Sequence, residues 1–119
     1  MTEPSQNELI EQRLNELYEI IGDKLIATLA LYIENSGINL SNLEKAFEAQ
    51  NLQQLADISH QMKGSSANLG AQNFSKLCGQ LEVLSRQTSD FNEIDKILSM
   101  IRVQNSAIIE VLTKYLTSI

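Results

Sequence analysis

The chain has one histidine, His60, within the stretch ISHQMKGSSANLGAQ that spans residues 58–72. Histidine side chains have a pKa of about 6.5, so near neutral pH a ring nitrogen is available as a nucleophile and can carry a phosphoryl group. Lys63 and Gly64 follow three and four residues later, where they are the neighbours of the imidazole on a helix. The lysine ammonium suits an anion held on the ring, and the glycine leaves an open approach that a larger side chain narrows. For a lone exposed histidine the ordinary interpretation is a solvated side chain of no chemical role, and the spacing of Lys63 and Gly64 leaves open the alternative that His60 carries a phosphoryl group.

The apolar residues of this segment predict a helix that begins near Leu52 and ends at Gly70. At about 100° per residue they form one stripe, and His60 points roughly 160° away from it. A glycine after the last turn can take the left-handed conformation that closes a helix, which favours Gly70 as the stop. The stripe consists of Leu52, Leu55, Ile58, Met62 and Leu69, and the residues expected on the His60 face are Gln53, Ala56, Asp57, Lys63, Gly64 and Ala67.

The sequence HQMKGSSANLGA, followed by Cys78 and by the pair Leu81 and Glu82, resembles the histidine-containing phosphotransfer (HPt) domains of two-component phosphorelays. In that family a histidine on a helical bundle accepts a phosphoryl group from the aspartate of a response-regulator receiver domain, and returns it or passes it on. The resemblance implies that His60 is the phosphoacceptor. It also implies that residues 1–119 form a single HPt domain, with about residues 1–5 frayed at the N-terminus.

The resemblance assigns supporting roles around His60. In the family, a Gln or Glu on the next helix accepts a hydrogen bond from the imidazole, and the matching residue is Glu82; a solvated surface glutamate is the alternative. Arg86, one turn further along, can pair with Glu82 or contact phosphate oxygens. The residues expected to support the imidazole or the phosphoryl group are Lys63, Gly64, Ser65, Glu82 and Arg86.

The chain has neither a nucleotide-binding glycine loop nor a carboxylate cluster for a metal ion, so the resemblance implies that the catalytic machinery belongs to a partner. The expected partners are receiver domains, which supply the aspartate and Mg²⁺, and a hybrid sensor histidine kinase. The chain itself is expected to bind no cofactor and no metal. It is a transfer intermediate without kinase activity of its own, and whether that makes it an enzyme stays open. The residues expected to contact the partner are Gln53, Ala56, Asp57 and Ala67.

Two other functions remain open on the sequence. One is a helical adaptor, in which the His60 face docks a partner and no phosphate moves. The other lies within the family and is the phosphoacceptor module of a chemotaxis-type kinase, which receives phosphate from an ATP-binding domain. Labelling by a phosphorylated receiver, as against ATP plus kinase, separates the relay protein from the kinase module.

Composition limits the classes of partner. The 119 residues carry 9 Lys and Arg against 15 Asp and Glu, and the net charge of −6 disfavours nonspecific binding to nucleic acid or anionic lipid. The longest apolar run, LIATLALYI at residues 25–33, is about half of the ~20 residues needed to cross a bilayer. The acidic start MTEPSQNE is unlike a signal peptide, and the single Cys78 has no internal disulfide partner and lies on an apolar helix stripe. We expect a cytoplasmic monomer without nucleic-acid or membrane binding.

One proline, five glycines and no tryptophan leave few turn signals, which favours an all-α fold. The expected architecture is an antiparallel four-helix bundle with an additional N-terminal helix or helices. A capping residue followed three residues later by Glu or Gln marks a helix start, and such starts occur at Ser5, Ser41, Asn51 and Asp90. The expected helices run from Ser5 to about Ile21, from Asp23 to about Asn35 with a stop at Ser36 and Gly37, from Ser41 onward, from Leu52 to Gly70, from Ala71 to Gln87, and from Asp90 to about Tyr115.

Overall fold

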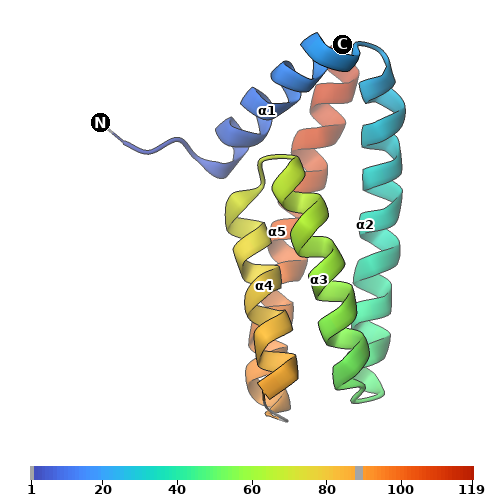
Figure 1. Cartoon of the computed structure of the whole chain (residues 1–119), viewed down its shortest axis with the longest axis vertical. Helices are drawn as coiled ribbons and strands as arrows, with labels where there is room; N and C mark the ends of the chain where they lie inside the picture. Colours follow the sequence, from blue (N-terminus) through green and yellow to red (C-terminus); the bar gives the residue numbers. More distant parts are fainter. Residues whose placement is uncertain (1, 88–89) are drawn as a thin grey trace.

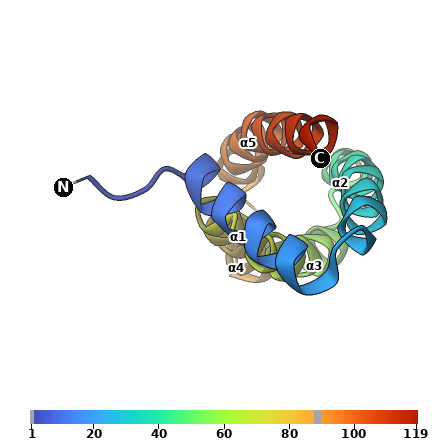
Figure 2. The same ribbon diagram turned by 90° about the horizontal axis from the view of Figure 1, so that it is seen from above.

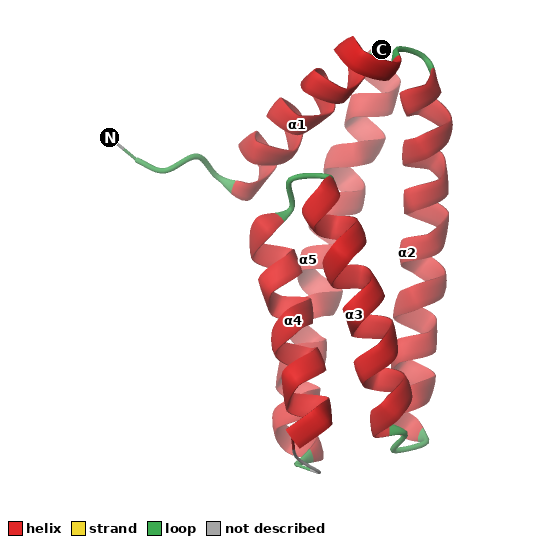
Figure 3. Ribbon diagram, viewed as in Figure 1, coloured by secondary structure: helices red, strands yellow, loops and turns green. Residues whose placement is uncertain are grey.

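The computed structural model describes residues 2–87 and 90–119, and within these ranges the chain is helical and contains no strand (Figure 1). Only short connections separate the helices (Figure 3). No helix in the described ranges combines the length and apolar character that a membrane span requires. The helices are α1 (Gln6–Ile21), α2 (Lys24–Glu48), α3 (Leu52–Asn68), α4 (Gln72–Gln87) and α5 (Phe91–Ser118).

Helices α2 to α5 run alternately up and down and surround a common axis, while α1 lies across one end of them, above α3 and α4 (Figure 2). The predicted all-α fold, an antiparallel four-helix bundle with one additional N-terminal helix, is confirmed. Residues 2–5 of the segment expected to be frayed are not helical, and residue 1 lies outside the described residues.

Three of the four predicted helix starts are confirmed by their capping contacts. The Ser5 hydroxyl accepts a hydrogen bond from the Glu8 amide at 3.1 Å, and the Asn51 side chain accepts one from the Gln54 amide at 3.0 Å. Asp90 accepts from the backbone amides of Asn92 and Glu93. Each cap satisfies an amide that has no partner within its own helix, so these sequence signals fix the starts of α1, α3 and α5.

The prediction of a break at Ser36 and Gly37, with a new helix from Ser41, is wrong. Helix α2 runs without interruption through all three residues. Its buried side continues across the expected break, from Leu29 through Ser36 to Leu43, at the seven-residue spacing that keeps residues on one face of a helix. Packing of an amphipathic face supplies most of the stability of a helix in a protein, so one exposed glycine costing about 1 kcal/mol does not end it.

The connection between α3 and α4 depends on Gly70 and on α1. Gly70 has φ +84°, the left-handed conformation predicted for it, and a Cβ at this position would lie 2.9 Å from the backbone oxygen of Leu9 in α1. The Arg13 guanidinium of α1 donates to the Asn68 carbonyl at 3.1 Å, and the Phe74 amide donates to the Gln6 side chain at 2.8 Å. Helix α1 thus holds the turn that sets the position of α4 against α3.

The hydrophobic core lies between the four bundle helices and extends to the buried side of α1. Cys78 belongs to this core, as its stripe predicted, and burial raises the pKa of its thiol to about 12. The thiol therefore stays protonated at neutral pH and packs as a small apolar group. The largest fully buried side chains are Ile10, Leu14, Leu25, Leu29, Leu43, Leu55, Phe74, Leu81, Ile94, Leu98, Ile101 and Ile108.

Two glycine substitutions test this account of the helices. Gly37→Ala should raise the free energy of unfolding by up to ~1 kcal/mol, because the site is helical and a Cβ there meets no neighbouring atom within 4 Å. Gly70→Ala should lower it by at least ~1 kcal/mol, because alanine disfavours a positive φ and its Cβ would contact α1. Urea unfolding followed by circular dichroism measures both changes. The account would be refuted if Gly37→Ala lowered the free energy of unfolding and Gly70→Ala raised it.

Candidate functional site

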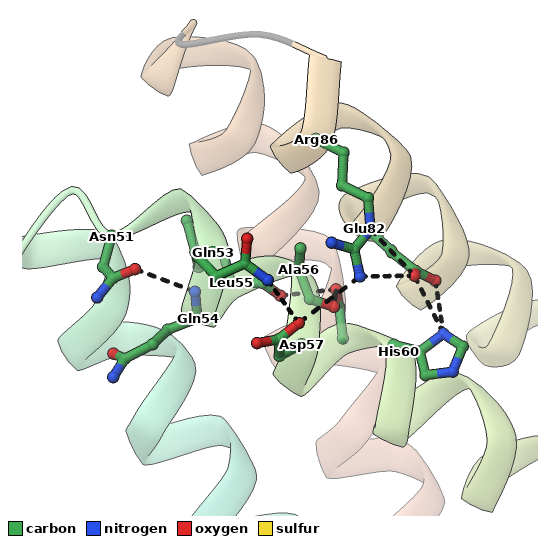
Figure 4. A network of polar contacts seen from close by, with 10 residues as sticks. Asn51, Gln53, Gln54, Leu55, Ala56, Asp57, His60, Glu82 and Arg86 are labelled. Atoms are coloured by element: carbon green, nitrogen blue, oxygen red, sulfur yellow. Dashed lines mark hydrogen bonds and ion pairs between the residues drawn. The ribbon is translucent and has the colours of Figure 1, made fainter.

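His60 lies in the middle of α3, with its side chain 67% exposed. It projects from the helix on the side opposite Met62, which is buried in the core. The predicted outward orientation of the imidazole is confirmed, and the ring is accessible to a second molecule. Figure 4 shows the ring beside α4 and at the end of a chain of polar side chains.

The imidazole forms a hydrogen bond with Glu82 of α4. Its Nδ1 atom lies 3.0 Å from Oε2 and 3.1 Å from Oε1 of the carboxylate, whose side chain is only 15% exposed (Figure 4). A carboxylate accepts hydrogen bonds, so the proton of the neutral ring belongs on Nδ1 and the lone pair on Nε2. Among the described residues no side chain bonds to Nε2. The structure thus brings together the predicted pair and leaves one nucleophilic nitrogen open.

Glu82 is itself held by a network across α3 and α4 (Figure 4). The Arg86 guanidinium donates to Oε2 at 3.2 Å and lies 3.6 Å from Asp57 of α3, which accepts a 2.9 Å hydrogen bond from Gln53. The hydrogen bond with His60 and those from Arg86 hold the pKa of Glu82 below its usual range, although desolvation opposes them. The carboxylate is therefore charged at neutral pH, and of the two roles open to Arg86 the structure shows the pairing with Glu82.

Gly64 lies one turn after His60 and is exposed, and a Cβ placed on it would meet no neighbouring atom within 4 Å. The open approach predicted for this side of the imidazole is therefore present. Lys63 does not extend freely into solvent. Its Cδ and Nζ atoms lie 3.4 and 3.8 Å from the position of a Cβ on Gly79 of α4, and its carbonyl accepts a 2.8 Å hydrogen bond from Ser75.

Gly79 is a contributor to the site that the sequence analysis missed. Because Gly79 has no side chain, the stem of Lys63 lies close against α4, the helix that also carries Glu82. An alanine here would make ordinary van der Waals contact with the lysine stem, whereas a long side chain would compete with Lys63 for the same space. The available signal was a glycine in the interior of a helix with no turn to make, which is unfavourable unless close approach requires it.

The prediction that Ala56 contributes to an exposed partner surface is wrong, because Ala56 is only 1% exposed. The predicted stripe counted apolar residues alone, whereas Ser59 and Ser66 are also fully buried. Ser59 donates to the Leu55 and Ala56 carbonyls and Ser66 donates to the Met62 carbonyl at 2.6 Å, so neither hydroxyl needs water. The buried side of α3 is therefore wider than its apolar residues indicate, and it extends to Ala56.

The remaining predicted residues lie where their helix positions put them. Gln53 and Asp57 are exposed and belong to the network around Glu82, and Ala67 is half-buried. The Ser65 hydroxyl is turned back onto its own helix, where it donates to the Met62 carbonyl at 3.3 Å. Within the described part of the chain, no group of three or more His, Cys, Asp or Glu residues is placed to hold a metal ion.

An exposed imidazole on an antiparallel helical bundle, with a carboxylate of the next helix bonded to its Nδ1, is the arrangement that the resemblance to HPt domains predicts. The Hpt domain family model matches residues 27–111, so the chain belongs to the Hpt domain family. It is 37% identical over 51 residues to the multistep phosphorelay regulator 1 of Schizosaccharomyces pombe, an alignment that covers 43% of this chain and 17% of that protein. Its fold is similar to the crystal structure of histidine-containing phosphotransfer protein B of Pseudomonas aeruginosa PAO1. The TM-score is 0.85 at 21% identity, and the match covers 91% of this chain and 93% of that one.

The hydrogen bond to Glu82 should determine which ring nitrogen carries the proton. In the unphosphorylated protein at neutral pH, we expect the neutral imidazole to be protonated on Nδ1, because the charged carboxylate accepts that hydrogen. In Glu82→Ala the Nε2-protonated form should appear, while Gln53→Ala, which changes only the far end of the network, should resemble the wild type. The ¹⁵N chemical shifts of the single imidazole measure this, and an unchanged tautomer in Glu82→Ala would contradict the assigned role.

Proposed function

We propose that this chain is a phosphorelay intermediate that accepts a phosphoryl group on Nε2 of His60 from the aspartyl phosphate of a receiver domain and passes it to another receiver. The observation that carries the proposal is the hydrogen bond from Nδ1 to Glu82, which leaves the Nε2 lone pair facing solvent. Membership of the Hpt domain family supports the class of reaction.

In the proposed transfer, Nε2 attacks the phosphorus atom of the aspartyl phosphate, and the bond from phosphorus to the aspartate oxygen breaks. The aspartate leaves as a carboxylate. The ring gains positive charge as the N–P bond forms, and the charged Glu82 beside the Nδ1 proton offsets it. The Lys63 ammonium offsets part of the negative charge on the phosphoryl oxygens, and we expect Mg²⁺ on the receiver to neutralise more of it.

The charge distribution supports a local docking surface. The family resemblance implies a receiver whose active site is rich in aspartate, which a protein of net charge −6 would repel, so we expect association to depend on the cations near His60. Lys63 and Lys76 line an open groove of about 640 Å³ over α4 and α5, together with Glu93, the exposed Val83 and the half-buried Ile97. We propose that a receiver contacts Gln53, Asp57, Lys63 and Ala67 together with the near edge of this groove, and that a hybrid sensor kinase presents such a receiver. The monomeric state and cytoplasmic location stay predictions, which gel filtration and cell fractionation test.

The test of the proposed function is labelling by a ³²P-phosphorylated receiver. The wild type should gain acid-labile, alkali-stable phosphate, and His60→Gln should gain none while keeping its helical circular dichroism, because the chain has no other histidine. Label retained by His60→Gln would refute the site. Labelling by ATP plus kinase but never by a receiver would favour the chemotaxis-type module, and no labelling by either would favour the adaptor.

Gly64 tests whether the open approach matters. Gly64→Ala should raise the free energy of unfolding by up to ~1 kcal/mol, because no neighbouring atom obstructs the new Cβ. Gly64→Gln should reduce the transfer rate by about tenfold or more, since a long side chain beside the imidazole obstructs the in-line approach. Gly37→Gln is the matched control, because Gly37 is also exposed and helical but lies on α2. Normal transfer by Gly64→Gln would show that access does not limit the reaction.

A further inference from the structure

A second feature of α3 lies beside the histidine face and has no part in the proposed transfer. It is a hollow of about 360 Å³ lined mainly by α2 and α3, which are neighbours in the bundle (Figure 2), with Phe74 of α4 and Asn105 of α5 also in its lining. Its inner wall includes the buried residues Ser36, Met62, Phe74 and Asn105. This volume falls within the range of small-molecule sites, about 300 to 1,000 Å³.

Two polar side chains that line the hollow have no hydrogen-bond partner. The Ser36 hydroxyl and the Asn105 side-chain oxygen are buried, with residue exposures of 6% and 5%, and neither is bonded to any residue that the structure describes. Buried polar atoms are almost always hydrogen-bonded, and leaving one without a partner is unfavourable. Since the amide oxygen of Asn105 can only accept, the occupant of the hollow must donate a hydrogen bond.

The other lining residues indicate the chemistry of that occupant. None of the lining side chains is charged, and burial raises the pKa of Tyr32 to about 12, so its hydroxyl is neutral at physiological pH. An ion would be left without a counter-charge, which disfavours a charged ligand. The aromatic ring of Tyr32 lies with Met62 and Phe74 in the lining, which suits an apolar ring, and the carboxamides of Asn39 and Gln61 at the rim can each donate and accept.

We propose that the hollow binds a neutral small molecule that combines a planar apolar ring with N–H donors, such as a heteroaromatic carboxamide or a nucleoside. The ring packs against the aromatic and thioether side chains, and the N–H groups satisfy Ser36 and Asn105. The α3 wall of the hollow includes Gln61 and Ser65, which lie next to His60 and Gly64 in the sequence. A bound molecule therefore contacts the same two turns of helix that carry the phosphoacceptor.

Two matched pairs of probes test the proposal on the unphosphorylated full chain, so the result does not depend on the proposed phosphotransfer. Nicotinamide and adenosine are neutral and carry N–H donors, whereas nicotinate and adenosine monophosphate keep the same rings and are anionic. In ¹H–¹⁵N NMR titrations, at least one neutral probe should bind with a millimolar dissociation constant, as expected for small ligands, and should shift the amides of Ser36, Gln61, Ser65 and Asn105. Its anionic counterpart should bind at least about tenfold more weakly.

Asn105→Leu provides the matched variant, because it fills the inner wall and removes the unpartnered acceptor without touching the His60 face. The variant should keep the spectrum of a folded protein and lose binding of the neutral probe, while Gln53→Ala on the opposite face of α3 should bind it normally. The proposal is overturned if neither neutral probe binds, since the hollow then holds water only. It is also overturned if an anionic probe binds as well as its neutral counterpart, or if Asn105→Leu binds unchanged.

Discussion

The hydrogen bond between His60 and Glu82 joins α3 to α4 and therefore depends on the relative position of the two helices. A displacement of α4 by one residue along its axis, about 1.5 Å, would remove the carboxylate from Nδ1. Three features fix that position: the left-handed turn at Gly70, the packing of Leu9 in α1 against that turn, and the hydrogen bond from Ser75 to the Lys63 carbonyl. Helix α1, remote from the imidazole, therefore helps to orient it.

Electrostatics at the site follow from the same packing. Glu82 is charged and mostly buried, a costly arrangement that is tolerated because Arg86 and the imidazole both donate to it. The ion pair between Arg86 and Asp57 is exposed on both sides and therefore adds little stability. The result is a negative charge on Glu82 beside Nδ1, and a cation, Lys63, whose stem packs against α4.

The sequence was sufficient for the all-α bundle, for three capped helix starts and for the outward orientation of His60, because these depend on local spacing and capping. The sequence was insufficient where contacts with a distant part of the chain determine whether a helix continues or a residue is buried. The continuity of α2 depends on packing that outweighs a local stop signal at Gly37, and the burial of Ala56 depends on the helices that pack against α3. The position of Glu82 beside the imidazole was expected from family resemblance, since no spacing rule relates residues on two helices.

Glycines show why one residue type alone does not identify a site. Gly37 and Gly64 are both exposed, both inside helices and both free of neighbouring atoms, so their local cost is the same. Only the surroundings differ, because Gly64 lies one turn from the imidazole of His60, whose Nδ1 atom is hydrogen-bonded to Glu82 of α4. Gly79 differs again, since the stem of Lys63 lies within contact distance of the position that its Cβ would occupy. An unfavourable residue indicates function when a neighbouring group makes use of the space, and that neighbour must be found in three dimensions.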